Sequence, residues 1–370
     1  MKTSNILNYS YQISDGLTQT SSDGICMAFD KKYGIMFCAY MPGPQGRYGE
    51  SRGRIVLTYF PAAQPFNSKT IDISTDKDVF VPNIISLGDG SVRVFYEKDS
   101  RANGDHFIGY KDFNFLTNNL TEEKYVMLKK EDGSIAPLTA SEQLKYLEQK
   151  GFNNHTFLAT EQMTFGGHTI FKGEDGLLYG SITSYLAEPI LYRSSDNLQT
   201  VEFFAVCPHP AQYEMDYKIL KGKIYAIYRT PPQINSIFLT QSEDGGKTWS
   251  QPYVIKDSVS CRPRIILYND SVLYAYNHYV QDCGNRPPVI EGRSSIRIYY
   301  GTNLENDKNK LVADLFSKYG MVNVCMIDIL GDVYLGYSTS ELALEYQNGA
   351  PQVRGKDAIR YVKLGDMLEE

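Results

Sequence analysis

The feature that most constrains the fold is a hairpin that recurs six times along the chain. Each copy has a turn of Gly or Asp character, followed by an alternating strand that is rich in tyrosine. The turns are centred on Gly34, Gly90, Gly176, Gly222, Ser271 and Gly331. Glycine suits a tight hairpin turn that needs a positive φ. The repetition therefore predicts a modular architecture built from one kind of unit.

Each hairpin is flanked by two further strand-like segments. An apolar run precedes it, for example residues 167–171 or 215–220, and a third alternating segment follows it, for example residues 236–243. Most turns are 46 to 60 residues apart. Six antiparallel units at this interval predict an all-β fold, a six-bladed β-propeller with four-stranded blades. We expect residues 1–370 to form this propeller as a single domain.

One interval is longer than the others and leaves room for an insertion. Between Gly90 and Gly176 lies the segment LTASEQLKYLEQKG. In it, Thr139 and Glu142 have the spacing of a capping box, and Gly151 can end a helix. We predict a short helical insertion around residues 139–150.

Composition restricts the partners. The net charge of -6 argues against nucleic acid or an anionic membrane as the main partner. No run is long and apolar enough for a membrane span, and the first residues lack the apolar core of a leader. No metal-ligand spacing occurs, so we expect neither metal nor cofactor. The six cysteines form no CxxC pair. We interpret them as buried reduced thiols, which favours a cytoplasmic location.

The segment TQSEDGGKTWSQ, residues 240–251, contains the only tryptophan of the chain. It combines Ser242, Asp244, Thr248 and Trp249 with two glycines, and residues 194–201 repeat its Ser, Asp and Thr positions one blade earlier. Asp and Ser side chains can bind the backbone N–H groups of a tight turn. We therefore expect a structural turn, with the tryptophan packed between neighbouring sheets.

The pattern S-x-D-x-G-x-T-W is the Asp-box, also called the BNR repeat. Six blades that carry Asp-boxes resemble the sialidase (neuraminidase) superfamily, over nearly the whole chain. The resemblance implies an exo-glycosidase acting on acidic sugars at the mouth of the propeller. It further implies a tyrosine nucleophile paired with a glutamate, three arginines that bind the substrate carboxylate, and an aspartate that acts as acid and base.

Four residues match this arrangement in order and spacing. Glu214 opens the inner strand of the fourth blade, and Arg229 ends its second strand, 15 residues later. Arg293 precedes the third strand of the fifth blade, and Tyr319 opens the inner strand of the sixth. The resemblance implies that Tyr319 is the nucleophile, that Glu214 is its partner, and that both arginines bind substrate.

The match breaks in the first blade. Where the family has its first arginine, the segment TSSDGICMAF has Asp23 and Gly24. Arg262, which begins the inner strand of the fifth blade, is the best substitute. The alternatives are Arg47, Arg52, Arg54 and Arg264. The family's aspartate is replaced by Glu50, with Asp105 in the second blade as the rival.

We therefore expect a sialidase-like hydrolase that removes a terminal acidic sugar from a short oligosaccharide or glycoside. One alternative is a propeller enzyme on another acidic sugar, either a uronide hydrolase or a polysaccharide lyase. A lyase would use a histidine as acid or base, and His209 and His278 are the candidates. The other alternative is a non-catalytic carbohydrate-binding propeller. The sequence leaves the sugar, the linkage and the oligomeric state open.

Overall fold

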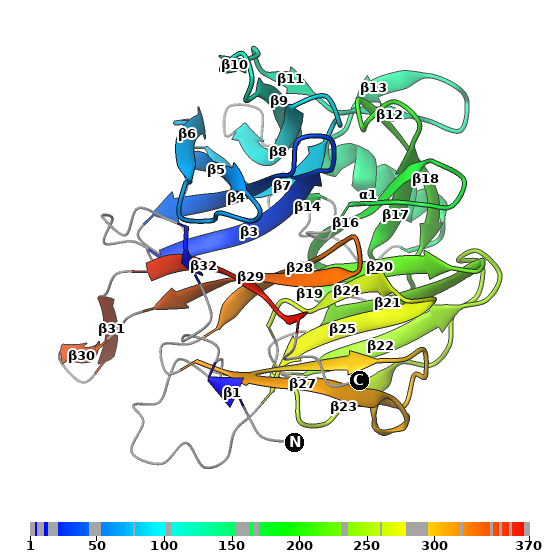
Figure 1. Ribbon diagram of the computed structural model, residues 1–370. Coiled ribbons are helices and arrows are strands. Elements are labelled where there is room, and N and C mark those ends of the chain that lie inside the picture. The colour runs from blue at the N-terminus through cyan, green and yellow to red at the C-terminus, as the bar shows by residue number, and fades with distance from the viewer. Residues whose placement is uncertain are drawn as a thin grey trace.

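The chain forms six antiparallel sheets around a central axis, the six-bladed β-propeller that the repeat predicts (Figure 1). The computed structural model describes residues 4–5, 11–13, 21–43, 53–76, 78–100, 105–152, 163–165, 170–209, 211–212, 214–230, 236–259, 261–278, 295–317, 321–340, 343–347, 350–354 and 357–365. Every structural statement below concerns these residues.

Blades one, two and four have the regular order, with the strands following one another from the axis outward. Blade one contains β3 (Ser21–Asp30), β4 (Ile35–Gly43), β5 (Ile55–Pro61) and β6 (Lys69–Ser74). Blade two contains β7 (Val79–Ser86), β8 (Ser91–Ser100), β9 (Asp105–Asn114) and β10 (Asn119–Leu120), and β11 (Lys124–Tyr125) also pairs with β9. Blade four contains β20 (Met215–Leu220), β21 (Lys223–Arg229), β22 (Ile237–Ser242) and β23 (Tyr253–Ile255).

Blade three is larger than the repeat predicts. Its main strands are β16 (Leu178–Ala187), β17 (Ile190–Ser194) and β18 (Thr200–Val206). The inner strand expected over residues 167–171 differs, because two short strands, β14 (Met163–Phe165) and β15 (Phe171–Lys172), pair with β16 instead. On the outer side, β12 (Met127–Lys129) pairs with β18 in parallel and with β13 (Ile135–Pro137) in antiparallel fashion. The short β19 (Ala211–Gln212) also pairs with β16.

The start of the chain completes the last two blades. Blade five contains β24 (Arg264–Tyr268), β25 (Ser271–Asn277), β26 (Ser295–Tyr300) and β27 (Lys310–Phe316), and β1 (Ser4–Asn5) joins β27 in parallel. Blade six contains β28 (Val322–Ile329), β29 (Asp332–Ser340) and β32 (Asp357–Lys363). Its fourth strand is β2 (Tyr11–Gln12), which pairs with β32. The hairpin of β30 (Ala343–Gln347) and β31 (Ala350–Arg354) projects beyond blade six (Figure 1).

The predicted insertion contains the helix α1 (Ala140–Gln149). As the capping box predicts, Thr139 is the N-cap and its side chain accepts a hydrogen bond from the N–H of Glu142, at 3.2 Å. The helix buries Tyr146 and Leu147 against Ala187 and Ile190, which flank the turn between β16 and β17. The insertion therefore covers one end of blade three.

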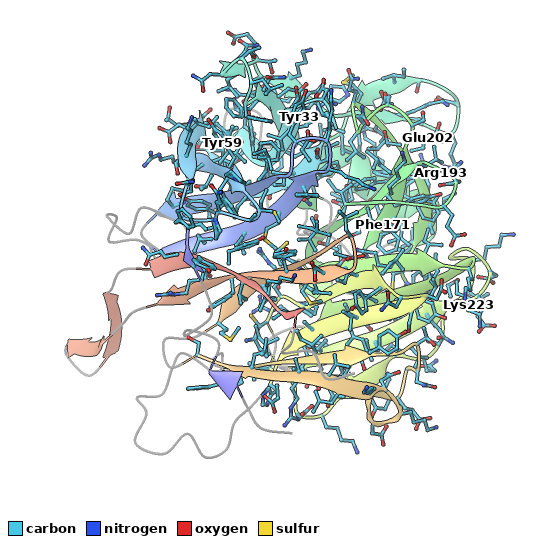
Figure 2. The ribbon with its side chains drawn as sticks, viewed as in Figure 1. Tyr33, Tyr59, Phe171, Arg193, Glu202 and Lys223 are labelled. Atoms are coloured by element: carbon cyan, nitrogen blue, oxygen red, sulfur yellow. The ribbon has the colours of Figure 1, made fainter. Side chains whose placement is uncertain are left out.

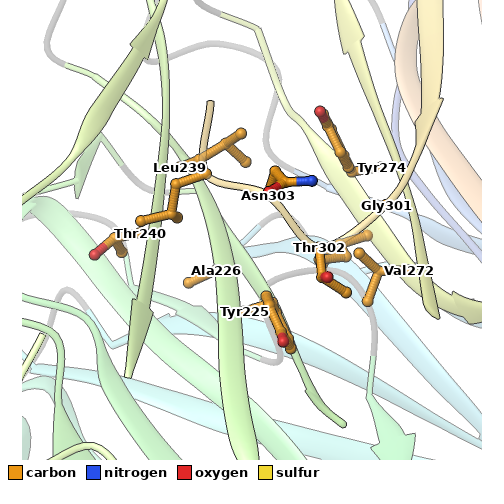
Figure 3. Close-up of a pocket in the computed structure, with 11 residues that line it drawn as sticks. Tyr225, Ala226, Leu239, Thr240, Val272, Tyr274, Gly301, Thr302 and Asn303 are labelled. Carbon is orange, nitrogen blue, oxygen red and sulfur yellow. The ribbon is translucent and has the colours of Figure 1, made fainter. Parts of the chain in front are cut away.

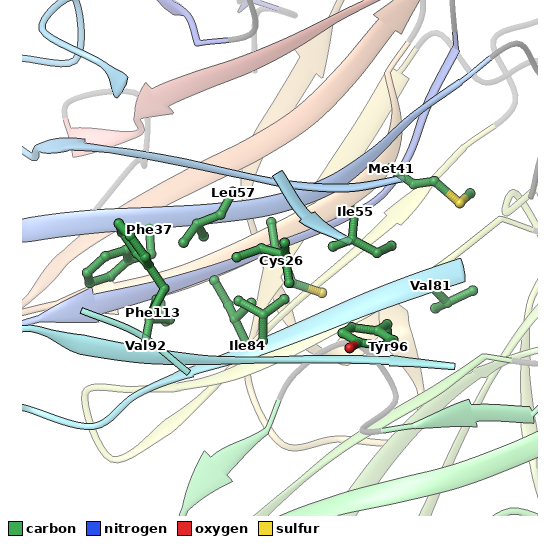
Figure 4. Close-up of a cluster of buried hydrophobic side chains, with 14 of the residues drawn as sticks. Cys26, Phe37, Met41, Ile55, Leu57, Val81, Ile84, Val92, Tyr96 and Phe113 are labelled. Atoms are coloured by element: carbon green, nitrogen blue, oxygen red, sulfur yellow. The ribbon is translucent and has the colours of Figure 1, made fainter. Parts of the chain in front are cut away.

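The hydrophobic core is divided among the junctions between blades. A cluster of buried side chains lies between each pair of neighbouring blades, including the first and the last, so that the ring is closed. Figure 4 shows the cluster between blades one and two, where Phe37 and Leu57 face Ile84 and Val92. Burial of each such side chain contributes about 1.5–3 kcal/mol.

Polar side chains also join neighbouring blades, by bonding to the backbone of the next blade. Such a bond is present at five junctions within the described residues. The pairs are Asp30 Oδ2 with Gly90 N, Asn83 Nδ2 with Phe165 O, Ser181 Oγ with Met215 O, Asp216 Oδ2 with Ile265 N, and Asn277 Nδ2 with Met321 O, at 2.7–3.1 Å. These bonds satisfy backbone groups that lie outside the ladders of their own sheets.

The hairpin turns adopt the backbone conformation that their sequence predicts. At the five glycine turns, φ lies between 67° and 91°. The sixth turn has no glycine, and there Asn269 (φ 43°) and Asp270 (φ 57°) supply the positive angles. Asn and Asp tolerate this region better than other residues with a side chain.

The turn at residues 242–249 is held by the predicted hydrogen bonds. The hydroxyl of Ser242 accepts the N–H of Gly246 at 2.8 Å and donates to Asp244 at 2.9 Å. Asp244 also accepts the N–H and the hydroxyl of Thr248, which lower the pKa of Asp244 to about 2. The indole of Trp249 donates to the carbonyl of Gly246 and packs against the cluster between blades three and four. The turn has a structural role.

The related turn one blade earlier has the same bonding pattern. Asp196 accepts the hydroxyl of Ser194 at 2.8 Å and the N–H of Thr200 at 2.9 Å. Asn197 (φ 58°) and Leu198 (φ 62°) take the left-handed conformation that glycines adopt in the other turn. Both turns connect the third and fourth strands, at the end of the blade that also carries the glycine hairpins.

Five cysteines belong to the described residues, and all five are buried. They are Cys26, Cys38, Cys207, Cys261 and Cys325. No disulfide links any two of these five, as predicted, and burial raises the pKa of Cys207 to about 12. The sixth, Cys283, lies outside the described residues.

Candidate active site

Antiparallel order brings the starts of the inner strands and the ends of the second strands to the same end of the propeller. We call this end the mouth. In blade four, Glu214 directly precedes β20 and Arg229 is the last residue of β21. The backbone N–H of Arg229 donates to the carbonyl of Glu214 at 2.9 Å. Arg262 lies two residues before β24, at the mouth end of blade five.

The side chains of these three residues meet. Arg229 Nη1 lies 3.2 Å from Glu214 Oε2, and Arg262 Nε lies 3.2 Å from Glu214 Oε1. The Glu214 side chain is 10% exposed and that of Arg262 is 5% exposed, against 18% for Arg229. A carboxylate is thus held between two guanidinium groups that come from two different blades.

The two arginines determine the charge of Glu214. Burial alone would raise the pKa of its carboxyl, but the nearby charges of Arg229 and Arg262 outweigh burial and lower the pKa. Glu214 is therefore ionised at neutral pH, and it can accept a hydrogen bond from a hydroxyl group at the mouth.

A second group of charges, which we call the second tier, lies one step further along the inner strands. It consists of Asp216, Lys218 and Arg264, each at most 3% exposed. Lys218 Nζ lies 3.0 Å from Asp216 Oδ1 and 4.6 Å from the centre of the Phe171 ring, which is labelled near the middle of the ring of blades in Figure 2. Burial lowers the pKa of Lys218 and of Arg264.

The mouth and the second tier together carry more cations than carboxylates. Arg229, Arg262, Lys218 and Arg264 stand against Glu214 and Asp216. This local excess of positive charge occurs in a chain with a net charge of -6. A region of positive potential at a concave mouth favours an anionic ligand.

Three of the six predicted site residues are therefore brought together. The other three, Glu50, Arg293 and Tyr319, lie outside the described residues, as do the alternative arginines 47 and 52. Arg54 pairs with Asp72 on the outer strand β6 of blade one, and its side chain is 46% exposed. That pairing directs Arg54 toward the outside of its blade.

Asp105, the rival acid, supports the helical insertion. Its Oδ1 accepts the N–H of Ser141 in the first turn of α1, at 3.1 Å, and the N–H of His106 at 2.9 Å. An acceptor at a helix N-terminus compensates the unsatisfied N–H groups there. The bonds of Asp105 therefore account for its position.

The two candidate histidines are bound to other partners. His209 stacks on Tyr228, and its Nε2 lies 3.2 Å from the carbonyl of Ser250. Burial lowers the pKa of His209. His278 Nε2 lies 3.1 Å from Asp314 Oδ1, within blade five. Each histidine is thus part of the packing within or between blades.

Sequence reasoning missed Asp216 and Lys218 and named Arg264 only as an alternative. The signal is the alternation in EMDYK, residues 214–218. Charges at every second position share one face of a strand. Because the other face packs Met215 and Tyr217 into the core, the charged face must point toward the axis.

The cavity in Figure 3 does not belong to this site. It lies between blades four and five, and its lining includes Tyr225, Leu239, Val272 and Tyr274. Its volume is about 20 Å³, which is enough for about one water molecule. It is too small for a sugar.

Two searches concern the described part of the chain only. No group of three His, Cys, Asp or Glu side chains converges there as metal ligands. No helix there is long and apolar enough to span a membrane.

Comparison with known proteins relates this chain to sialidases through its fold. No protein-family model matches the chain, and no curated protein matches its sequence. Among solved structures, Trypanosoma rangeli sialidase in complex with 2,3-difluoro-KDN matches with a TM-score of 0.60 and 11% identity, over 94% of this chain and 54% of that one. The Hadza microbial sialidase Hz136 matches with 0.62 and 12%, over 97% and 69%.

A third structure agrees. The K499G mutant of NanB sialidase from Streptococcus pneumoniae matches with a TM-score of 0.59 and 12% identity, over 98% of this chain and 71% of that one. The chain spans about half the length of the Trypanosoma rangeli sialidase. At this identity the likeness concerns the fold alone. The chain is a six-bladed propeller with a sialidase-like fold.

Proposed function

We propose that this chain is an exo-glycoside hydrolase that removes a terminal acidic sugar, of the sialic-acid type, from short glycans. The observation that carries the proposal is the placement of Glu214 between Arg229 and Arg262 at the mouth of the propeller. The likeness to sialidase structures supports it. The five buried cysteines are consistent with the cytoplasmic location that we also propose.

In the proposed mechanism, Tyr319 is the nucleophile. Its phenol oxygen forms a bond to the anomeric carbon as the bond to the leaving oxygen breaks, and Glu214 takes the phenol proton. Glu50 donates a proton to the leaving oxygen, and it then removes a proton from the water that cleaves the glycosyl–tyrosine bond. A neutral phenol suits an anionic substrate, because a carboxylate nucleophile would be repelled by it.

The arginines bind the carboxylate of the sugar in this proposal. Arg229 and Arg293 hold positions that match the sialidase pattern, and Arg262 takes the place of the arginine that blade one lacks. A guanidinium presents paired N–H donors that fit a carboxylate. Support for Arg262 comes from its contact with Glu214, since that contact places it at the mouth beside Arg229.

The test is a screen of aryl glycosides that includes sialosides and uronides. If a sialoside is cleaved, Tyr319→Phe and Glu214→Gln should each reduce kcat by at least a hundredfold, about 3 kcal/mol of activation free energy. The matched controls are Tyr334→Phe, in blade six, and Glu202→Gln, in an exposed ion pair with Lys129. Full activity in either site variant would refute the assigned roles.

Other outcomes would select the other candidates. Cleavage of uronides alone, with a product that does not absorb in the near ultraviolet, would identify a uronide hydrolase. An unsaturated product that absorbs there would identify a lyase. Binding of an acidic sugar without turnover, unchanged in Tyr319→Phe, would identify a non-catalytic binding protein.

A further inference from the structure

The junction between blades four and five contains a bond that the mechanism does not use. Ile265 is the second residue of β24, the innermost strand of blade five. Its N–H does not bond to the neighbouring strand β25; it donates to Asp216 Oδ2 at 3.0 Å. An inner strand has one edge without a strand partner, so half of its N–H groups need another acceptor.

The same carboxylate is fully engaged. Asp216 Oδ1 accepts from Lys218 Nζ at 3.0 Å, and Asp216 is 2% exposed. Removing a carboxylate from water is costly unless its oxygens have partners. Here both oxygens have one, so the side chain is fixed in a single orientation.

This bond and the active-site contact join the same two segments of chain. Glu214 and Asp216 lie two residues apart on one face of the blade-four segment. Their partners, Arg262 and Ile265, lie three residues apart on the blade-five segment. Any sliding of β24 along β20 would break the Asp216–Ile265 bond and would move Arg262 relative to Glu214.

We propose that Asp216 is a positioning residue, which fastens β24 to β20 and thereby sets Arg262 against Glu214. As far as catalysis is concerned, the inference rests on the proposed function. The geometric part does not, because it concerns only where Arg262 lies.

A neutral acceptor would serve the backbone equally well at this point. Asn83, Ser181 and Asn277 form the corresponding bonds at other junctions without a charge. A buried ion pair such as Asp216–Lys218 adds little stability compared with apolar residues of the same volume. The proposal therefore assigns the positioning to the hydrogen bond that Asp216 accepts, and not to its charge.

Two double variants separate these effects, Asp216→Asn with Lys218→Met and Asp216→Leu with Lys218→Met. Both remove both charges and both nearly conserve volume. They differ only in whether residue 216 can accept the N–H of Ile265. Differences between them therefore report on the hydrogen bond alone. If the Leu variant fails to fold, Asp216→Ala with Lys218→Met takes its place.

The first readout is a crystal structure of each variant. In the Asn variant, Arg262 Nε should stay near the 3.2 Å that separates it from Glu214 Oε1. In the Leu variant, the two atoms should move beyond about 4 Å, the limit of an ion pair. Equal distances in the two variants would overturn the proposal.

The second readout is the pKa of Glu214, followed by NMR. It should remain low in the Asn variant and rise in the Leu variant, because Arg262 no longer favours the charged form. Equal pKa values in the two variants would likewise overturn the proposal.

The third readout is kinetic and depends on the proposed function. With a cleaved sialoside, the Leu variant should show a KM at least tenfold above that of the Asn variant, since Arg262 binds substrate. If the wild type cleaves no glycoside, the proposed function fails, and the distance and the pKa still decide on Asp216.

Discussion

Removal of the charge on Glu214 should destabilise the fold, independently of any activity. In Glu214→Gln, Arg229 and Arg262 keep their positive charges and lose their shared counter-charge. The Arg262 side chain is 5% exposed and that of Arg229 is 18% exposed, so water compensates only in part. Removing one partner of a buried ion pair destabilises by about 3–5 kcal/mol. Because Gln still accepts a hydrogen bond, we expect about 3 kcal/mol.

The effect should depend on pH, with a definite sign. The pKa of Glu214 in the folded chain is lowered from its ordinary value of 4.5. Its stabilising contribution is therefore fully present above pH 4.5, and it is lost as the pH falls through the lower folded-state value. The difference in stability between wild type and variant should be constant near neutral pH and should shrink below pH 4.5.

The assay is thermal unfolding followed by the fluorescence of Trp249, the only tryptophan of the chain. For a chain of 370 residues, about 3 kcal/mol corresponds to a decrease in Tm of about 4 °C. The control is Glu202→Gln, which breaks exposed contacts with Lys129 and Arg193 and should change the stability by less than about 1 kcal/mol. An unchanged Tm for Glu214→Gln at neutral pH would refute the reasoning. A decrease of equal size at pH 3 would refute it as well.

Three further predictions concern other parts of the chain. Gly246→Ala should lower the free energy of unfolding by about 2–4 kcal/mol, because an added Cβ would lie 2.5 Å from a neighbouring Cβ at φ +91°. Gly245→Ala has open space and should lower it by only about 1 kcal/mol, so equal urea midpoints would contradict the geometry. The five buried cysteines should resist alkylation in the native protein, as peptide mass spectrometry would show; rapid labelling of any of them would contradict their burial. Arg262→Met should weaken the binding of an acidic sugar at least tenfold by calorimetry, whereas Arg54→Met, in an exposed pair, should not; equal affinities would exclude Arg262 from the binding site.

The sequence predicts the blades well because each blade is defined by local features. A turn with positive φ, an alternating strand and an apolar run lie within a few residues of one another, and each leaves a periodic signal. The bonds within the turn at residues 242–249 are predictable for the same reason. They link residues two to four positions apart, so the spacing of Ser, Asp and Thr is sufficient.

Features that depend on distant pairing leave no such signal. The strands β1 and β2 are two residues long, and they exist because they pair with β27 and β32, more than 300 residues away. The inner strand of blade three was misplaced because the apolar run at residues 167–171 resembles the runs that form strands in other blades. Asp216 was missed because its acceptor role is visible only when Ile265 of the next blade is in place.

The position of Arg262 shows why a site of this kind tolerates change in its sequence. The inner strands of all six blades converge on one axis, so a long side chain at the start of any of them can reach the mouth. In this chain, blade one has Asp23 and Gly24 where the sialidase pattern has an arginine, and blade five provides a guanidinium against Glu214. For an anionic substrate, the location of the charge at the mouth matters more than the blade that supplies it. We therefore regard the contact between Arg262 and Glu214, rather than the missing arginine, as the better indicator of what the mouth can bind.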